Sequence, residues 1–153
     1  MDIVKEIKAI LALQDPDEKD GRLSVLNSEF EYDHELNKAN VMEGTQLLLT
    51  AALREGNKAL RKKFFRTIDQ AVVYQNIGDC ITWDPLAILL PSLEKRDLVY
   101  VLDIIGLSGQ RKYLSLLEEY AHHADPEIRQ WASEALEDLE DSMAHASDSQ
   151  KAG

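Results

Sequence analysis

Apolar residues recur at the spacing of an α-helix through almost all of the 153-residue chain. A clear example is the stripe formed by Leu60, Phe64, Ile68 and Val72. Residues four positions apart lie on one face of a helix, whereas a half-buried strand alternates apolar and polar residues. No segment shows that alternation convincingly, so the sequence predicts an all-α fold.

The same spacing predicts where individual helices lie. We expect seven helical segments, covering residues 3–13, 41–54, 58–74, 85–93, 98–107, 112–123 and 128–143. Gly56 and the run 76–79 mark breaks between them. Pro91 falls inside a predicted helix and should kink it, because proline lacks a backbone N–H.

The first 40 residues are the hardest to interpret. Asp15 and Pro16 stop the first helix and could start another, since aspartate caps helices and proline suits their first turn. After them, several glycine, asparagine and serine residues interrupt the apolar pattern. We expect loops around short helical pieces here, so residues 1–40 form an irregular N-terminal cap.

An internal repeat emerges when the helices are paired. A shift of 31 residues superimposes Val101, Ile104 and Ile105 on Ala132, Ala135 and Leu136, and a shift of 68 superimposes the stripe from Leu60 to Ile68 on the same helix. Residues 41–143 then form three helical hairpins, with a period near the short end of the range for helical repeat arrays.

These hairpins resemble HEAT repeats. Residues 113–117, followed by 125–136, look like the two-helix unit of that family, and residues 104–109 are similar to its tight turn into the next repeat. The match is best over residues 85–140. The resemblance implies a short right-handed α-solenoid of about seven to eight helices. It also implies one domain over residues 1–143, to which we add a disordered polar tail at 144–153.

Solenoids present their second helices as one wall, which is usually the partner-facing one. The repeat register brings Lys63, Tyr100 and Trp131 to equivalent positions on that wall. It would run from a basic to an acidic end, although Trp131 could instead cap the core and the basic run could be an ordinary solvated face. The candidate partner-binding residues are Lys62, Lys63, Arg66, Tyr100, Asp103, Trp131, Glu134 and Glu137.

No catalytic or metal-binding set is evident in the sequence. His122 and His123 are adjacent, so on a helix they point about 100° apart and chelate poorly. His34–Glu35 resembles the His–Glu pairs with which a family of metal-dependent HEAT enzymes binds iron. Such a site needs several of these pairs, and this chain has only one. Cys80 follows Asp79, whose carboxylate opposes thiolate formation. We therefore expect no enzyme activity, no cofactor and no bound metal.

The net charge of −11 is concentrated at the two ends of the chain, with −5 over residues 1–40 and −6 over residues 121–153. This balance argues against nucleic-acid binding, since the only basic patch is at residues 58–66. The acidity serves either solubility or the attraction of a basic partner. The chain has no apolar run of the roughly 20 residues that a membrane span needs and no secretion signal, so we expect a cytoplasmic protein.

These features together predict a non-catalytic protein-binding module. The most specific hypothesis is a bacterial immunity or antitoxin-like protein that neutralises a basic toxin domain. The alternative is an adaptor, or an assembly or chaperone-like HEAT protein. A metal-dependent HEAT enzyme comes third.

Overall fold

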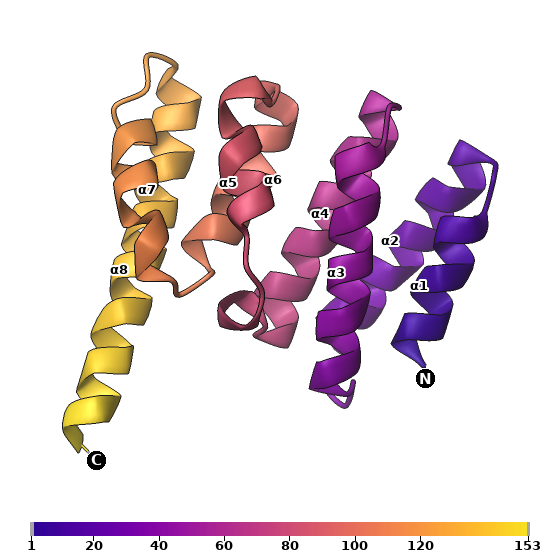
Figure 1. The fold of residues 1–153 in the computed structure, drawn as a ribbon, viewed down its shortest axis with the longest axis horizontal. Helices are drawn as coiled ribbons and strands as arrows, with labels where there is room; N and C mark the ends of the chain where they lie inside the picture. Colours follow the sequence, from indigo (N-terminus) through magenta and orange to yellow (C-terminus); the bar gives the residue numbers. More distant parts are fainter. Residues whose placement is uncertain (1, 153) are drawn as a thin grey trace. The chain divides into compact units, whose positions relative to one another are not determined.

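A computed structural model describes the backbone of residues 2–152 and the side chains of residues 2–145. Within this part of the chain, helices and turns account for all regular structure and no strand is present, which confirms the all-α prediction (Figure 1). The α-helices are α1 (Ile3–Ala12), α2 (Pro16–Tyr32), α3 (Lys38–Arg54), α4 (Lys58–Gln75), α5 (Asp84–Leu89), α6 (Lys95–Gly106), α7 (Leu114–Tyr120) and α8 (Pro126–Ala152). The 3-10 helices are η1 (Gly78–Cys80), η2 (Leu90–Ser92) and η3 (Arg111–Tyr113).

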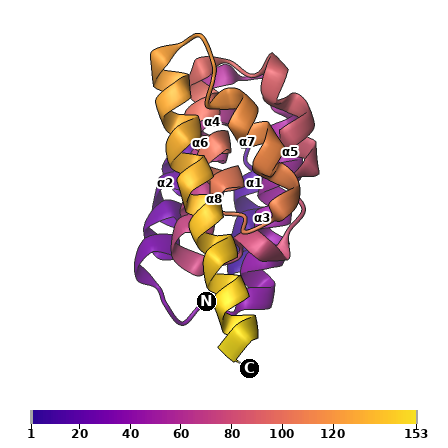
Figure 2. The ribbon, with the colours of Figure 1, turned by 90° about the vertical axis from the view of Figure 1, so that its left-hand side faces the viewer.

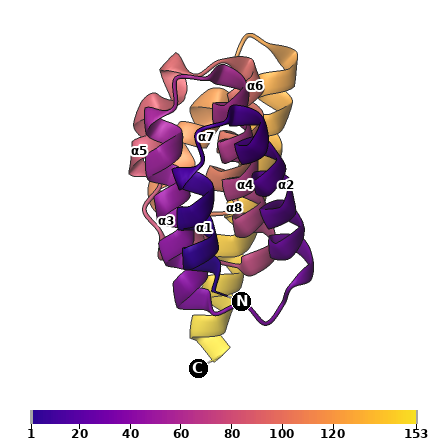
Figure 3. The ribbon, with the colours of Figure 1, turned by 90° about the vertical axis from the view of Figure 1, so that its right-hand side faces the viewer.

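The chain divides into two compact units, residues 1–77 and 78–153, and each is described by itself. In the first unit, α1 and α2 form one hairpin and α3 and α4 form another. The first helices of the two hairpins, α1 and α3, pack together, and so do the second helices, α2 and α4, as seen from the side of α1 in Figure 3. The finer prediction of one right-handed solenoid over residues 1–143 stays a prediction.

Each helix of the first unit begins at a residue that caps it. The side chains of Asp2, Asp15, Asn37 and Asn57 accept hydrogen bonds from the free N–H groups of the following turn, at 3.0–3.2 Å. Such caps satisfy donors that have no partner within the helix. At its other end α4 stops at Asn76, which adopts the left-handed conformation that asparagine tolerates better than most residues.

The irregular cap expected over residues 1–40 is wrong in one respect, because α2 is a continuous helix. Leu23, Leu26, Asn27 and Phe30 are buried at helical spacing and face the core of the first unit. Asn27 occupies a position where an apolar residue would complete the pattern, and Gly21 lies within the helix with open space around it. Packing against α4 outweighs these weak local preferences.

In the second unit, α8 packs against both α6 and α7 (Figure 2). Helix α6 is apolar over a broad arc, and Leu98, Val101, Leu102 and Ile105 are at most 5% exposed. The structure continues α8 to Ala152, which includes most of the tail that we expected to be disordered. The side chains of residues 146–153 lie outside the described part, so the disorder of residues 144–153 stays a prediction.

Two predicted helices are shorter than expected. The segment 85–93 is not one kinked helix, because α5 ends at Leu89 and Pro91 lies in the 3-10 turn η2. A proline at this position cannot donate the next helical hydrogen bond and its ring clashes with the preceding turn. Similarly, residues 112–123 contain η3 followed by the short helix α7.

A buried polar network ties the start of the second unit to the segment before α7. The Tyr113 hydroxyl accepts a hydrogen bond from the Trp83 backbone N–H at 2.8 Å and donates one to Asp84 Oδ1 at 2.9 Å. Gln110 Nε2 donates to the carbonyls of Gly78 and Ile81 at 3.1 and 2.7 Å. These bonds satisfy backbone groups inside the second unit, where the Gly78 carbonyl also accepts a hydrogen bond from Trp83 Nε1 at 2.9 Å.

The end of α6 lies unusually close to α8. A Cβ atom added to Gly106 would lie 2.7 Å from both Cα and Cβ of Ala135. We expected Gly106 to help the chain turn, but it is the last residue of α6 and it is buried. Its role is to let two helix backbones approach each other, which any side chain would prevent.

This contact predicts the effect of Gly106→Ala. The added methyl group meets backbone atoms that cannot move aside, so we expect the free energy of unfolding to fall by about 1–3 kcal/mol. Gly21→Ala is the matched control, because nothing lies within 4 Å of the added Cβ. Since alanine favours the helix, this control should gain about 0.5–1 kcal/mol. Urea unfolding followed by circular dichroism measures both, and equal effects would contradict the close packing.

Candidate functional site

Acidic residues of α6 and α8 gather in the second unit, and each helix carries an aromatic residue one turn from them. We call this set the acidic face, and it consists of Tyr100, Asp103, Trp131, Glu134, Glu137, Asp138 and Asp141. Burial raises the pKa of Asp138 above its ordinary value, and the nearby carboxylates raise it further, with Asp103 first, then Asp141, Glu137 and Glu134. The shift shows that α6 and α8 bring these charges within electrostatic range of one another.

The spacing on α8 explains why the charges accumulate. Glu134, Asp138 and Asp141 are three or four residues apart, so they form a stripe along one side of the helix. Like charges at this spacing destabilise a helix by about 0.2–0.5 kcal/mol per pair. The stripe therefore works against folding, and stability does not explain its presence.

The aromatic side of the face is fixed by a lysine. Lys95 at the start of α6 lies with its Nζ atom 6.0 Å from the centre of the Trp131 ring, a cation–π distance. The same Nζ binds Glu127 and Asp125 at 2.8 and 2.9 Å. These two hydrogen bonds, that to Glu127 first, raise the pKa of Lys95. Its charge is thus already matched by Asp125 and Glu127, which are not part of the acidic face.

The sequence allowed Trp131 to be either a partner-binding residue or a cap on the core. In the structure it is partly exposed. Its ring contacts Lys95 within the same unit, so it is not a free surface residue. Neither is it buried as a core residue such as Trp83, which is fully enclosed. A held but accessible aromatic ring is the kind of group that anchors protein interfaces.

The basic residues predicted for the other end of the wall lie on α4, in the first unit. Lys63 donates a hydrogen bond to Ser24 Oγ and lies 3.7 Å from Asp20, and its side chain is only 14% exposed. It belongs to the packing of α4 on α2. Lys62 and Arg66 are exposed. A continuous wall from α4 to α8 stays a prediction.

The structure thus brings together three of the eight predicted residues, Asp103, Glu134 and Glu137, around Asp138. Tyr100 and Trp131 lie one helical turn before Asp103 and Glu134 on the same helices, and their place in a binding surface stays a prediction. Sequence reasoning missed Asp138 and Asp141. The signal was available, because both continue the stripe of Glu134 at helical spacing.

His122, His123 and Cys80 have partners within the fold. His123 Nδ1 accepts a hydrogen bond from the Asp125 backbone N–H at 2.9 Å, and His122 Nδ1 lies 2.9 Å from the Glu118 carbonyl oxygen. Cys80 Sγ lies 3.3 Å from Asp79 Oδ1. In the part of the chain that the structure describes, no group of three or more histidine, cysteine, aspartate or glutamate side chains could hold a metal ion.

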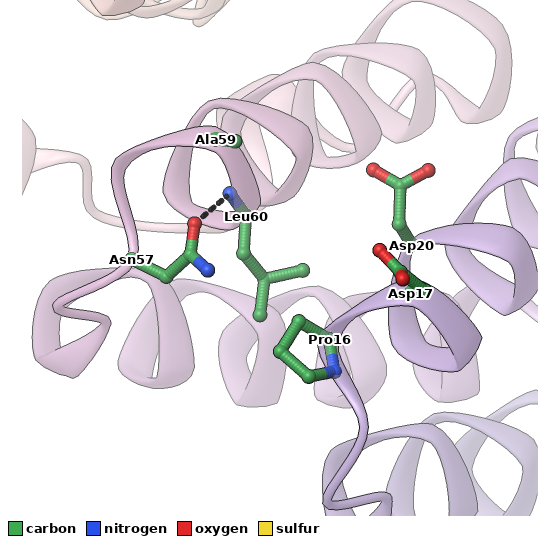
Figure 4. A pocket seen from close by; sticks show the side chains of 6 residues that line it. All are labelled: Pro16, Asp17, Asp20, Asn57, Ala59 and Leu60. Atoms are coloured by element: carbon green, nitrogen blue, oxygen red, sulfur yellow. Dashed lines mark hydrogen bonds between the residues drawn. The ribbon is translucent and has the colours of Figure 1, made fainter.

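A small hollow of about 150 Å³ lies where α2 and α4 begin (Figure 4). Its lining residues are Pro16, Asp17, Asp20, Asn57, Ala59 and Leu60. Asn57 Oδ1 accepts the Leu60 backbone N–H at 3.1 Å, as the dashed line in Figure 4 shows. The polar atoms near the start of α4 therefore serve as its cap, and the two aspartates of α2 would repel an anion.

Comparison with known proteins adds no relative, because the sequence matches no protein-family model, no curated protein and no solved structure. Among the residues that the structure describes, none of the helices is both long and apolar enough to cross a membrane.

The repulsion within the acidic face predicts how stability depends on pH. The folded-state pKa of Asp138 lies above its unfolded value, so ionised Asp138 costs stability at neutral pH, and this cost disappears as the pH falls towards 3.8. Asp138→Asn should therefore raise the free energy of unfolding at pH 7, by about 0.2–0.5 kcal/mol for each like-charge pair removed. Near pH 4 it should have little effect.

Asp125→Asn is the control, because it should change the free energy of unfolding in the opposite direction to Asp138→Asn. The hydrogen bond from Lys95 lowers the pKa of Asp125, so its ionised form stabilises the fold at neutral pH. This substitution should lower the free energy of unfolding at pH 7, as measured by urea unfolding across the pH range. The assignment of the acidic face is wrong if both substitutions shift stability in the same direction.

Proposed function

We propose that this chain is a non-catalytic protein-binding module of HEAT-type helical hairpins, and that its acidic face binds a basic protein. The observation that supports this proposal best is the concentration of carboxylates around Asp138, with Trp131 and Tyr100 one helical turn from Glu134 and Asp103. A basic partner would relieve the repulsion among these carboxylates, which is present in the free protein. Binding energy would then come from charges that are unfavourable in its absence.

The two kinds of residue on the face would contribute differently. Carboxylates at the rim of an interface mainly speed the encounter with an oppositely charged partner, and salt weakens this effect. Partly exposed aromatic rings supply the contact area that slows dissociation. Association should accordingly be fast and sensitive to salt, whereas the loss of Trp131 should mainly speed dissociation.

The most specific form of the proposal is an immunity or antitoxin-like protein. Such a protein neutralises a toxin domain by covering it, and a domain that acts on nucleic acid is commonly basic. The net charge of −11 and the acidic face would complement a domain of that kind. Within the wider proposal, this partner is the one to look for first.

Affinity capture from the native host tests the proposal. The wild-type chain is the bait, and a double variant, Trp131→Ala with Glu134→Lys, is compared with it. We expect the wild type to retain a basic protein. The variant should retain at most about one tenth of that amount, because it lacks the Trp131 ring and reverses the charge at position 134. Circular dichroism should show that the variant keeps its helices.

A matched control separates the face from general charge effects. Ile88→Ala with Glu118→Lys removes an exposed apolar side chain and reverses one exposed charge on α5 and α7, outside the acidic face. This control should capture as much partner as the wild type. Equal capture by all three baits, or capture of an acidic partner alone, would refute the assigned surface.

A further inference from the structure

Exposed large apolar side chains concentrate on two helices of the first unit. In the described part of the chain there are six of them, and four lie on the adjacent helices α2 and α4. They are Val25, Tyr32, Val73 and Tyr74, which are 51%, 72%, 45% and 41% exposed. Isolated exposed apolar residues are common, but a group of them on neighbouring helices marks an interaction site.

The group has a definite shape. Ser28 follows Val25 by three residues, and Tyr32 follows Ser28 by four. At this helical spacing the three residues form a ridge on the side of α2 that faces away from its buried residues. A shallow hollow of about 480 Å³ runs along this ridge, lined by Val25, Ser28, Glu29, Tyr32 and Asp33. We call these five residues the α2 ridge.

The end of α4 is held beside the end of the ridge. Gln75 Nε2 donates hydrogen bonds to the carbonyl oxygens of Phe30 and Asp33, at 2.6 and 3.0 Å. Tyr74 is hydrogen-bonded to Glu31, and the charge of Glu31 raises the pKa of the Tyr74 hydroxyl. A second aromatic ring is therefore fixed next to α2, and the exposed apolar area extends onto α4.

The polar residues around the ridge are mostly acidic. Burial, followed by a hydrogen bond with the Glu6 carboxyl group of α1, raises the pKa of Glu29 to about 7. Asp33 adds to the shift and Arg22 opposes it. The carboxyl groups of Glu6 and Glu29 lie close together, and each has an Oε2 atom that is buried without a hydrogen-bond partner.

We propose that the α2 ridge docks a segment of another protein that presents an arginine next to an aliphatic side chain. The aliphatic group would cover Val25 and Tyr32, and the guanidinium would bind the Glu6–Glu29 carboxyl pair. Arginine fits better than lysine because its planar group can bind two carboxylate oxygens at once and can stack on a tyrosine ring. This surface belongs to residues 2–77, so the inference goes beyond the acidic face and does not depend on it.

A second copy of this chain is a poorer occupant. In a symmetric dimer the same patch meets itself, which would bring Glu29, Glu31 and Asp33 of one copy against the same residues of the other. Like charges directly opposed across an interface cost free energy. Charge complementarity thus favours a basic partner.

Binding should release a proton. A guanidinium favours ionised Glu29, whereas the free protein holds Glu29 protonated below a pH of about 7. Affinity should therefore rise as the pH rises through 7, by about tenfold between pH 6 and pH 8, since the ionised fraction changes by about that factor. The groups that set this value are Glu6 on α1, Arg22 on α2 and Asp33 directly after α2.

Nuclear magnetic resonance of the full ¹⁵N-labelled chain tests the proposal. The probe is a short helical peptide with leucine and arginine on one face, and its control replaces arginine by citrulline, which has the same shape but no charge. We expect amide shifts along α2 with the arginine peptide and binding about tenfold weaker with the citrulline peptide. The same α2 shifts should persist in the Trp131→Ala, Glu134→Lys variant, which isolates the ridge from the acidic face.

Three variants sharpen the result. Tyr32→Ala should weaken binding of the arginine peptide, and Glu29→Gln should both weaken it and remove its pH dependence. Ile88→Ala removes the most exposed large apolar side chain elsewhere in the described chain. It should change neither the binding of the arginine peptide nor its pH dependence. The proposal is overturned if the two peptides bind equally, or if shifts appear only at residues 100–141. It is also overturned if sedimentation shows a dimer that Tyr32→Ala dissociates.

Discussion

The close packing of α6 on α8 is the contact on which the acidic face depends. Gly106 has no side chain, so the backbone of α6 can approach Ala135 at a distance that no other residue would permit. This approach brings Asp103 of α6 into the electrostatic field around Asp138 of α8. If the helices were further apart, water would screen the two sets of charges from each other. The geometry of one glycine thus determines the electrostatics of a surface.

Both units keep carboxyl groups in places that oppose their ionisation. Glu29 lies next to Glu6 between α1 and α2, which raises the pKa of Glu29, and Asp138 lies among like charges on α8. Neither arrangement stabilises the fold. Lys95, which could neutralise part of the acidic face, is instead bound to Asp125 and Glu127 at the start of α8. Such unfavourable charges are consistent with surfaces that a partner completes, because functional sites tolerate what folding alone would avoid.

The helices could be predicted from sequence where the apolar stripe was regular, as it is from Leu60 to Val72 on α4. Helix α2 was missed because Asn27 fills a buried position and Gly21 lies inside the helix, so local preference pointed to a loop. Tertiary packing decided the outcome there. The acidic half of the site could be predicted from the repeat register, which placed Asp103 and Glu134 on the same predicted wall. The Glu6–Glu29 pair joins two helices, and no local pattern reveals such a contact.

Hydroxyl-radical footprinting of the captured complex would test the binding role of the acidic face most directly. Oxidation of the Trp131 and Tyr100 side chains reports how accessible they are, and it can be compared between the free chain and the complex. The account predicts that both rings become protected on binding, while Tyr120 on α7 is oxidised to the same extent in each state. A complex that forms with Trp131 and Tyr100 as accessible as in the free chain would contradict the assignment of this face as the binding surface.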